Sequence, residues 1–202
     1  GWAAPEVEQT YARARVLCTQ VGKTPQLFST LRGLWRFNRS RGALPTAVEL
    51  GEELYRLAQH EAAPTHLLAA HDALGQTLFY LGDYTAAHSL HEESLEIRKE
   101  WGDQRGVASS LHSLGNVASY QGDYDSARSL YEESLALFRE LEVKRGVASS
   151  LNSLGLLAWK QGDYPAARSF NEESLTINKE SENKKGISDS LHNLANVIFD
   201  HG

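Results

Sequence analysis

The sequence predicts an all-α solenoid of stacked antiparallel helix pairs, and three observations carry this prediction. One segment recurs every 40 residues, as LGDYTAAHSLHEESLEI, QGDYDSARSLYEESLAL and QGDYPAARSFNEESLTI. A period of this length is typical of supersecondary units that bury their apolar faces only by stacking on one another. Within each unit the apolar residues recur at helical spacing, and glycines separate the helical segments. About ten helices are expected.

The first third of the chain is expected to hold three helices that match the repeat more weakly. Gly42 lies 40 residues before Gly82, and AVELGEELYRL aligns with AHSLHEESLEI one period later. This alignment predicts a first helix, helix A of its unit, over residues 24–41 and a second, helix B, over residues 44–60. An additional helix B is expected upstream, over residues 6–21.

Each regular unit combines a helix A and a helix B. Helix A of the third unit is expected over residues 106–121. Gly122 should end it, because glycine adopts the left-handed backbone conformation without strain, and Asp123 is the expected N-cap of helix B. The apolar faces are formed by Leu111, Leu114, Gly115 and Ala118 in helix A, and by Tyr124, Ala127, Leu130, Tyr131 and Leu135 in helix B.

Small residues are expected where the two helices of a unit approach closely. These are Gly75, Gly115, Gly155 and Ala195 in the A helices, opposite Ala87, Ala127 and Ala167 in the B helices. The loop EVKRG at residues 142–146 should lead from one unit to the next. The last segment, residues 186–200, is expected to form a helix A that has no helix B after it.

These residues resemble the tetratricopeptide repeat. The family pattern of L-G, followed later by an Ala four residues before an aromatic residue, is matched by Leu114-Gly115, Ala127 and Tyr131. The 40-residue period resembles the kinesin light chain variant of the family, whose usual unit has 34 residues. The resemblance implies a right-handed superhelix with the A helices on its concave face. The stretch YARARVLCTQVGKTPQLFSTLRGLWRF further resembles repeat arms of bacterial signalling ATPases, nucleotide cyclases and transcription regulators.

The length alone permits one or two domains, but a repeat through most of the sequence favours a single array over residues 1–202. Residues 1–62 would form its divergent units, residues 63–185 its regular repeats, and residues 186–202 its terminal helix A. Cys18 is the single cysteine, so an internal disulfide is excluded and a reducing cytoplasm is the expected location. The sequence has neither a leader peptide pattern at its start nor an apolar run that could cross a membrane. The lack of methionine, residue 1 included, suggests a piece excised from a longer protein.

Charge is distributed unevenly along the sequence. Residues 1–42 carry seven basic and two acidic residues, whereas the formal net charge of the whole chain is −6. Nucleic-acid binding needs a broad basic footprint, so this balance argues against nucleic acid as a partner.

No enzymatic, cofactor or metal function is expected. The phosphate-binding, hydrolase and dinucleotide motifs G-x-x-x-x-G-K-[ST], G-x-S-x-G and G-x-G-x-x-G are all missing from the sequence. His71, His88 and His91 could in principle supply three zinc ligands, but their spacing matches no zinc motif, and divergence between repeats explains them better. The repeated Glu-Glu pairs point about 100° apart on a helix, so they cannot converge as an acid and a base.

The candidate binding residues lie on the A helices, one step around from the apolar stripe. Amide side chains can bond both backbone groups of an extended peptide, and Tyr and Trp bury large areas at small entropic loss. The aromatic residues could equally pack between neighbouring units. The candidates are Arg32, Arg36, Arg39, Gln76, Phe79, Tyr80, His112, Asn116, Tyr120, Asn152, Trp159, Lys160, His192, Asn196 and Phe199.

Three arginines are spaced to share one face of the first helix A. Arg32, Arg36 and Arg39 could hold an acidic segment or a carboxylate through charge-assisted bonds. The alternative is an ordinary solvated face.

These observations predict a protein-protein interaction module that binds a peptide or protein segment in its groove. The family resemblance implies the sensing or scaffold arm of a larger signalling protein. The alternative is self-association, because the last helix carries an apolar stripe with no helix B to cover it. That stripe, through which a homodimer would form, consists of Leu191, Leu194, Val197 and Ile198.

Overall fold

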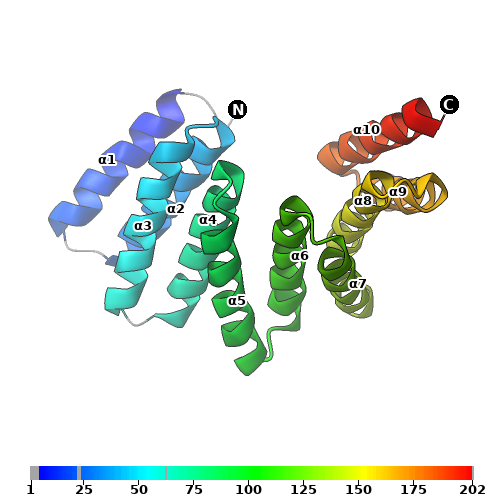
Figure 1. Cartoon of the computed structure of the whole chain (residues 1–202). Helices are drawn as coiled ribbons and strands as arrows, with labels where there is room; N and C mark the ends of the chain where they lie inside the picture. The colour runs from blue at the N-terminus through cyan, green and yellow to red at the C-terminus, as the bar shows by residue number, and fades with distance from the viewer. Residues whose placement is uncertain (1–4, 22–23, 62, 202) are drawn as a thin grey trace. The chain divides into compact units, whose positions relative to one another are not determined.

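The computed structural model describes residues 5–21, 24–61 and 63–201, and these ranges contain ten α-helices and no strand (Figure 1). The all-α prediction and the predicted helix number are therefore confirmed. None of the described helices is both long and apolar enough to cross a bilayer. The B helices are α1 (Pro5–Val21), α3 (Leu44–Glu61), α5 (Tyr84–Glu100), α7 (Tyr124–Glu140) and α9 (Tyr164–Glu180), and the A helices are α2 (Thr24–Ser40), α4 (Pro64–Leu81), α6 (Gln104–Gln121), α8 (Lys144–Lys160) and α10 (Lys184–His201).

Glycine and aspartate determine where the regular helices end and begin. Gly122 follows α6 with a φ of 85°, and its N–H bonds to the carbonyl of Ala118. The side chain of Asp123 then accepts a bond from the N–H of Ser126 at 3.1 Å, which satisfies one free donor at the start of α7. Both predicted roles are confirmed.

The A helices α6, α8 and α10 begin at least two residues earlier than the sequence predicted, whereas α2 begins at Thr24 as predicted. Asp103 accepts a bond from the N–H of Gly106 at 2.9 Å, so α6 starts at Gln104 and the glycine lies within its first turn. In the same way Lys144, Arg145 and Gly146 belong to α8 and not to the loop EVKRG. The glycine is needed for space, because a Cβ at Gly146 would overlap the ring of Phe138.

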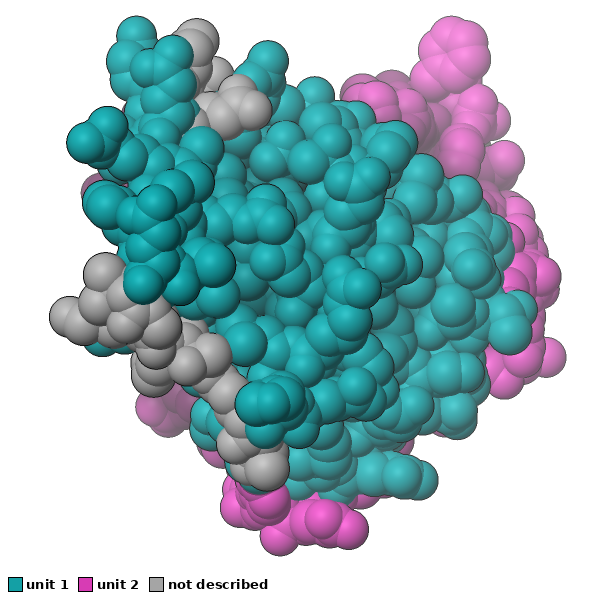
Figure 2. Space-filling model, turned by 90° about the vertical axis from the view of Figure 1, so that its left-hand side faces the viewer, with its two compact units in different colours: residues 1–97 teal, residues 98–202 magenta. Residues whose placement is uncertain are grey.

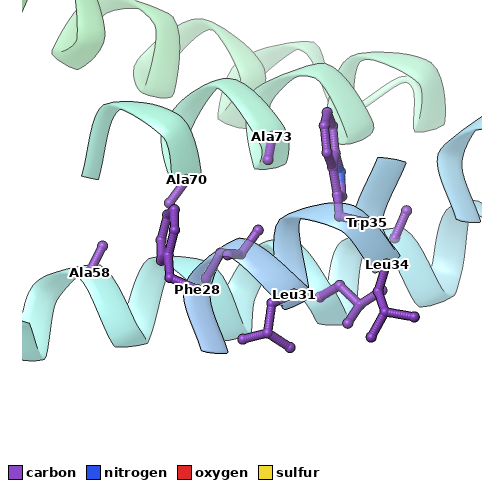
Figure 3. Packing of buried hydrophobic residues seen from close by; sticks show 10 residues of the cluster. Phe28, Leu31, Leu34, Trp35, Ala58, Ala70 and Ala73 are labelled. Atoms are coloured by element: carbon purple, nitrogen blue, oxygen red, sulfur yellow. The ribbon is translucent and has the colours of Figure 1, made fainter. Parts of the chain in front are cut away.

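Residue contacts divide the chain into two compact units, Gly1–Ile97 and Arg98–Gly202 (Figure 2). The core of unit 1 lies where α2 packs on α3 and α4, and Figure 3 shows Phe28 of α2 extending toward Ala70 of α4. Trp35 donates a hydrogen bond from Nε1 to the Thr77 hydroxyl at 2.9 Å, which satisfies the polar atom of an otherwise buried ring. One continuous array over residues 1–202 stays a prediction.

The core of unit 2 is built from the repeated apolar positions of α6, α7 and α8. Its largest members are Tyr131, Leu135, Phe138, Leu151, Leu154 and Leu157. A smaller cluster joins α8 to the last two helices through Ala158, Ala167 and Val197. Each fully buried leucine contributes roughly 2 kcal/mol by leaving water, so repeated positions account for the stacking of these helices.

The close approach between helices A and B differs in detail from the prediction. A Cβ at Gly115 would lie 2.7 Å from the ring of Tyr131, and one at Gly155 would lie 2.5 Å from the side chain of Asn171. The glycines therefore make room for the large residue one turn beyond the predicted alanine. Ala127 is fully buried in the core of unit 2.

Buried serines connect the helices of unit 2. The hydroxyls of Ser134 and Ser174 each donate to a carbonyl of the preceding helix A, those of Ala108 and Ala148, at 2.8 Å. Ser94 occupies the equivalent place in α5 and is equally buried, yet its hydroxyl has no hydrogen-bond partner among the described residues. The serine at this position therefore hydrogen-bonds helix B to helix A in α7 and α9, but not in α5.

Candidate functional site

All the candidate binding residues lie on A helices, which pack beside one another within each unit. In unit 1, α2 contacts α4, and these two helices form what we call the A face of unit 1. In unit 2, α6 contacts α8 and α8 contacts α10, which form the A face of unit 2. Several candidates bridge neighbouring A helices, which brings them to these faces.

The three candidate arginines of α2 separate on the A face of unit 1. Arg39 donates to Oε1 of Gln76 at 2.6 Å and lies 4.8 Å from the ring centre of Trp35. Arg32 and Arg36 instead line a cavity of about 370 Å³ together with His66 of α4. The structure therefore brings two of the three arginines into one pocket.

The aromatic candidates of α4 differ in exposure. Phe79 is half-buried and packs at 5.7 Å between ring centres against Tyr84 of α5. Tyr80, beside it, is 60% exposed. Of these two rings, Phe79 has the packing role that the sequence left open, and Tyr80 is accessible to a ligand.

A polar network occupies the centre of the A face of unit 2. The His112 ring, half-buried on α6, holds Nε2 at 3.0 Å from the Ser153 hydroxyl of α8. Asn116 accepts a hydrogen bond from the Tyr131 hydroxyl at 2.8 Å, and its amide nitrogen lies 3.4 Å from Nδ1 of His112. These contacts join α6, α7 and α8. His112 and Asn116 therefore hold the helices of this face together and also lie on the face itself.

Burial controls protonation in this network. It lowers the pKa of His112 to about 4, against a smaller opposing effect of a backbone hydrogen bond at Ser149. It also raises the pKa of the Tyr131 phenol far above its ordinary value. At neutral pH both side chains are therefore uncharged hydrogen-bonding groups.

The next candidates bridge α6, α8 and α10. Asn152 accepts a bond from the Ser190 hydroxyl at 3.0 Å, and Trp159 donates from Nε1 to the Asp200 carboxylate at 2.7 Å. Lys160 lies 5.0 Å from the ring centre of Tyr120, a cation-π distance. Tyr120 nevertheless stays 58% exposed.

The last helix presents a different set of residues from the predicted apolar stripe. Leu191 and Ile198 are 51% and 66% exposed, but Val197 is only 3% exposed because it packs in the cluster with Ala158 and Ala167. Phe199 is 88% exposed. His192 is exposed as well, whereas Leu194 and Asn196 are half-buried. Val197 therefore belongs to the core and Phe199 to the exposed surface of α10.

The sequence reasoning missed the basic residues near the start of the A helices. Arg105 and Arg145 line one cavity of about 280 Å³, and Arg145 and Lys185 line another of about 180 Å³. The pattern that could have found them is their spacing, since Arg105, Arg145 and Lys185 lie 40 residues apart.

The histidines considered for zinc do not form a cluster. His88 lies 3.1 Å from Glu92 on its own helix, and buried His71 lies 3.4 Å from Glu93. Within the described ranges no three His, Cys, Asp or Glu side chains are grouped to hold a metal ion.

Comparison with known families agrees with this geometry. The tetratricopeptide repeat model matches residues 26–100, 66–140 and 106–180, three overlapping stretches offset by one 40-residue period. The chain belongs to the tetratricopeptide repeat family. The resemblance seen in the sequence is thus confirmed, although no curated protein matches the chain significantly.

Several solved structures share the fold at low sequence identity. The kinesin light chain TPR-like repeats of Podosopora anserina are 18% identical, with a TM-score of 0.69 over 89% of this chain and 88% of that one. A Rap protein complexed with Competence and Sporulation Factor is 13% identical, with a TM-score of 0.81 over 94% and 57%. A signal transduction ATPase with a tetratricopeptide repeat sensor, from Pyrococcus horikoshii, is 15% identical, with a TM-score of 0.75 over 96% and 30%.

Proposed function

We propose that this tetratricopeptide repeat protein binds a peptide or protein segment on the faces formed by its A helices. The observation that carries the proposal is the exposure of aromatic rings there. Tyr80, Tyr120 and Phe199 lie in the last turns of α4, α6 and α10 and are 60%, 58% and 88% exposed. Rigid aromatic rings of this kind are typical anchors in protein interfaces.

Similar structures support the same assignment. A Rap protein of this fold is complexed with Competence and Sporulation Factor, and the repeat of the Pyrococcus horikoshii ATPase is a sensor. This chain spans 57% and 30% of those two proteins. We therefore propose that it serves in the cytoplasm as the sensing or scaffold arm of a larger signalling protein.

A peptide-display selection against the full chain tests this function. We expect selected peptides to lose roughly tenfold in affinity on Tyr120→Ala, because truncating an interface anchor typically costs about 1 to 2 kcal/mol or more. Trp101→Ala is the matched control, since Trp101 is 47% exposed in the turn between α5 and α6 and not on an A helix. Peptides that respond equally to both substitutions, or to neither, would contradict binding on the A faces.

Self-association through α10 is the second candidate, favoured by the exposure of Leu191, Ile198 and Phe199. Light scattering coupled to size-exclusion chromatography distinguishes it. A dimer that becomes a monomer in the double variant Leu191→Ser, Ile198→Ser would support self-association. A wild-type monomer at all accessible concentrations would rule it out.

A further inference from the structure

The A face of unit 2 contains two cavities that are related by the repeat. The first lies between α6 and α8 and is lined by Arg105, His112, Arg145 and Ser149 among others. The second lies between α8 and α10 and is lined by Arg145, Ser149, Asn152, Lys185 and the Asp189 carboxylate among others. Asn152 follows His112, and Lys185 follows Arg145, by 40 residues. The two cavities are therefore the same structural position used twice, with Arg145 and Ser149 shared between them.

Charge in unit 2 is segregated between the two kinds of helix. The A helices α6, α8 and α10 together carry six basic and two acidic residues, and α6 and α8 carry no carboxylate. The B helices α7 and α9 carry four basic and seven acidic residues. A net charge of +4 on one set of helices and −3 on the other makes the A face electropositive in a protein that is acidic overall.

Among the described residues, the first cavity is lined by two of these basic residues and by no carboxylate. Both Arg105 and Arg145 are exposed, and neither forms an ion pair with a carboxylate of the described residues. In the second cavity Lys185 lies 3.3 Å from Asp189, so its charge is partly neutralised. The Ser149 hydroxyl and the Asn152 amide nitrogen can donate hydrogen bonds to an anion, whereas the ring nitrogens of His112 already contact Ser153 and Asn116.

We propose that the A face of unit 2 binds an extended acidic segment of a partner protein, with one carboxylate in each cavity. This inference rests on the proposed function and names the chemistry of its ligand. Arginine side chains favour carboxylates because they offer paired N–H donors in a plane. Arg145, which lines both cavities, contacts both ends of the recognised segment.

The spacing of the cavities defines the spacing of the acidic residues. Packed helices lie about 8 to 10 Å apart, and α8 contacts both α6 and α10. A polyproline II segment rises about 3.1 Å per residue with three residues per turn, so side chains at i and i+3 point the same way about 9 Å apart. The recognised pattern is therefore two acidic residues separated by two others.

The test uses three fluorescein-labelled peptides of neutral, proline-containing sequence, titrated against the full chain by fluorescence anisotropy. The matched peptide carries glutamates at i and i+3, the short-spaced peptide carries them at i and i+2, and the neutral peptide carries glutamines at i and i+3. We expect the matched peptide to bind about tenfold more tightly than the neutral peptide, because a hydrogen bond to a charged group contributes about 1.5 kcal/mol or more. The short-spaced peptide should bind several-fold less tightly than the matched peptide.

Two substitutions assign the binding to the cavities. Arg145→Gln should weaken binding of the matched peptide about tenfold and leave that of the neutral peptide within about twofold. Arg139→Gln removes the same charge from a B helix, where Arg139 pairs with Glu173 at 2.7 Å, and should leave both affinities unchanged. Circular dichroism melting confirms that both variants keep the fold.

Several outcomes would overturn the inference. Equal binding of the matched and neutral peptides, or no binding up to millimolar concentration, excludes an acidic ligand. Equal effects of Arg145→Gln and Arg139→Gln indicate unspecific charge attraction, as does a short oligothymidine that binds as tightly as the matched peptide. The proposed function can survive any of these results. It would still stand if a neutral peptide selected by display loses affinity on Tyr120→Ala.

Discussion

At the scale of single residues, the repeats show that one position can hold different chemistry without loss of the fold. In successive repeats, the residue that faces the helix A glycine is His91, Tyr131 or Asn171. Each fills the space that the glycine leaves. The buried serines behave similarly, since Ser134 and Ser174 bond a carbonyl whereas Ser94 does not. The position opposite the glycine therefore accepts side chains of different size and polarity.

His112 is expected to make the protein less stable in mild acid. Burial lowers its pKa from 6.5 to about 4 in the folded protein, so the unfolded chain takes up a proton first as the pH falls. The free energy of unfolding should therefore decrease between pH 6.5 and 4 and show no further change from this residue below pH 4. The loss should be on the order of 2 kcal/mol after allowance for partial exposure.

Urea unfolding of wild type and His112→Asn between neutral pH and the lowered pKa of His112 measures this effect. Asparagine is the matched replacement because Asn152 occupies the equivalent position in α8. The variant should lose less stability than wild type over this range. Parallel pH profiles for the two proteins would show that His112 titrates normally in the folded state.

At the scale of elements, the turns that follow α5, α7 and α9 share one backbone requirement. Gly102, Glu142 and Glu182 all adopt a positive φ, of 67°, 53° and 51°. Only the glycine does so without steric cost, because the Cβ of other residues approaches the following carbonyl oxygen. Two of the three turns are therefore strained.

Glu142→Gly should stabilise the protein by about 1 kcal/mol, because it removes this strain. Glu133→Gly is the matched control, since Glu133 is exposed within α7 and glycine there should cost about 1 kcal/mol. Thermal melting should shift the two variants in opposite directions. A lower melting temperature for Glu142→Gly would mean that Glu142 contributes more through its side chain than its backbone costs.

At the scale of the whole molecule, residue contacts group the chain into two compact units. Repeat proteins derive stability from each unit and from contacts between nearest neighbours, so damage in one place should stay largely local. Leu154 is a suitable probe because it is almost completely buried in the core of unit 2.

Leu154→Ala should lower stability by about 3 kcal/mol through lost burial and the cavity left behind. Hydrogen exchange followed by mass spectrometry should then show faster exchange in α6 to α9 than in α2 to α4. Leu54→Ala, in the core of unit 1, should give the reverse pattern. Equal acceleration everywhere in both variants would indicate a single cooperative unit.

The 40-residue pattern alone determined the helix number, the pairing of helices and the roles of Gly122 and Asp123, because these depend on residues near one another in the sequence. The A-helix location of the candidate residues also followed from periodicity. Periodicity assigned Val197 to an exposed stripe, however, because the spacing within one helix does not show that Ala158 and Ala167 pack over it.

Only the tertiary structure decided which of the candidate side chains were already engaged. Arg39 bonds Gln76, Trp159 bonds Asp200, and Arg32 and Arg36 share a cavity with His66. These partners lie roughly 30 to 40 residues apart in the sequence. They meet only because the A helices of successive repeats pack side by side. The sequence by itself determined that the repeats stack. The spaces between the stacked helices depend instead on how side chains from different repeats pack, and so do the cavities that Arg145 lines.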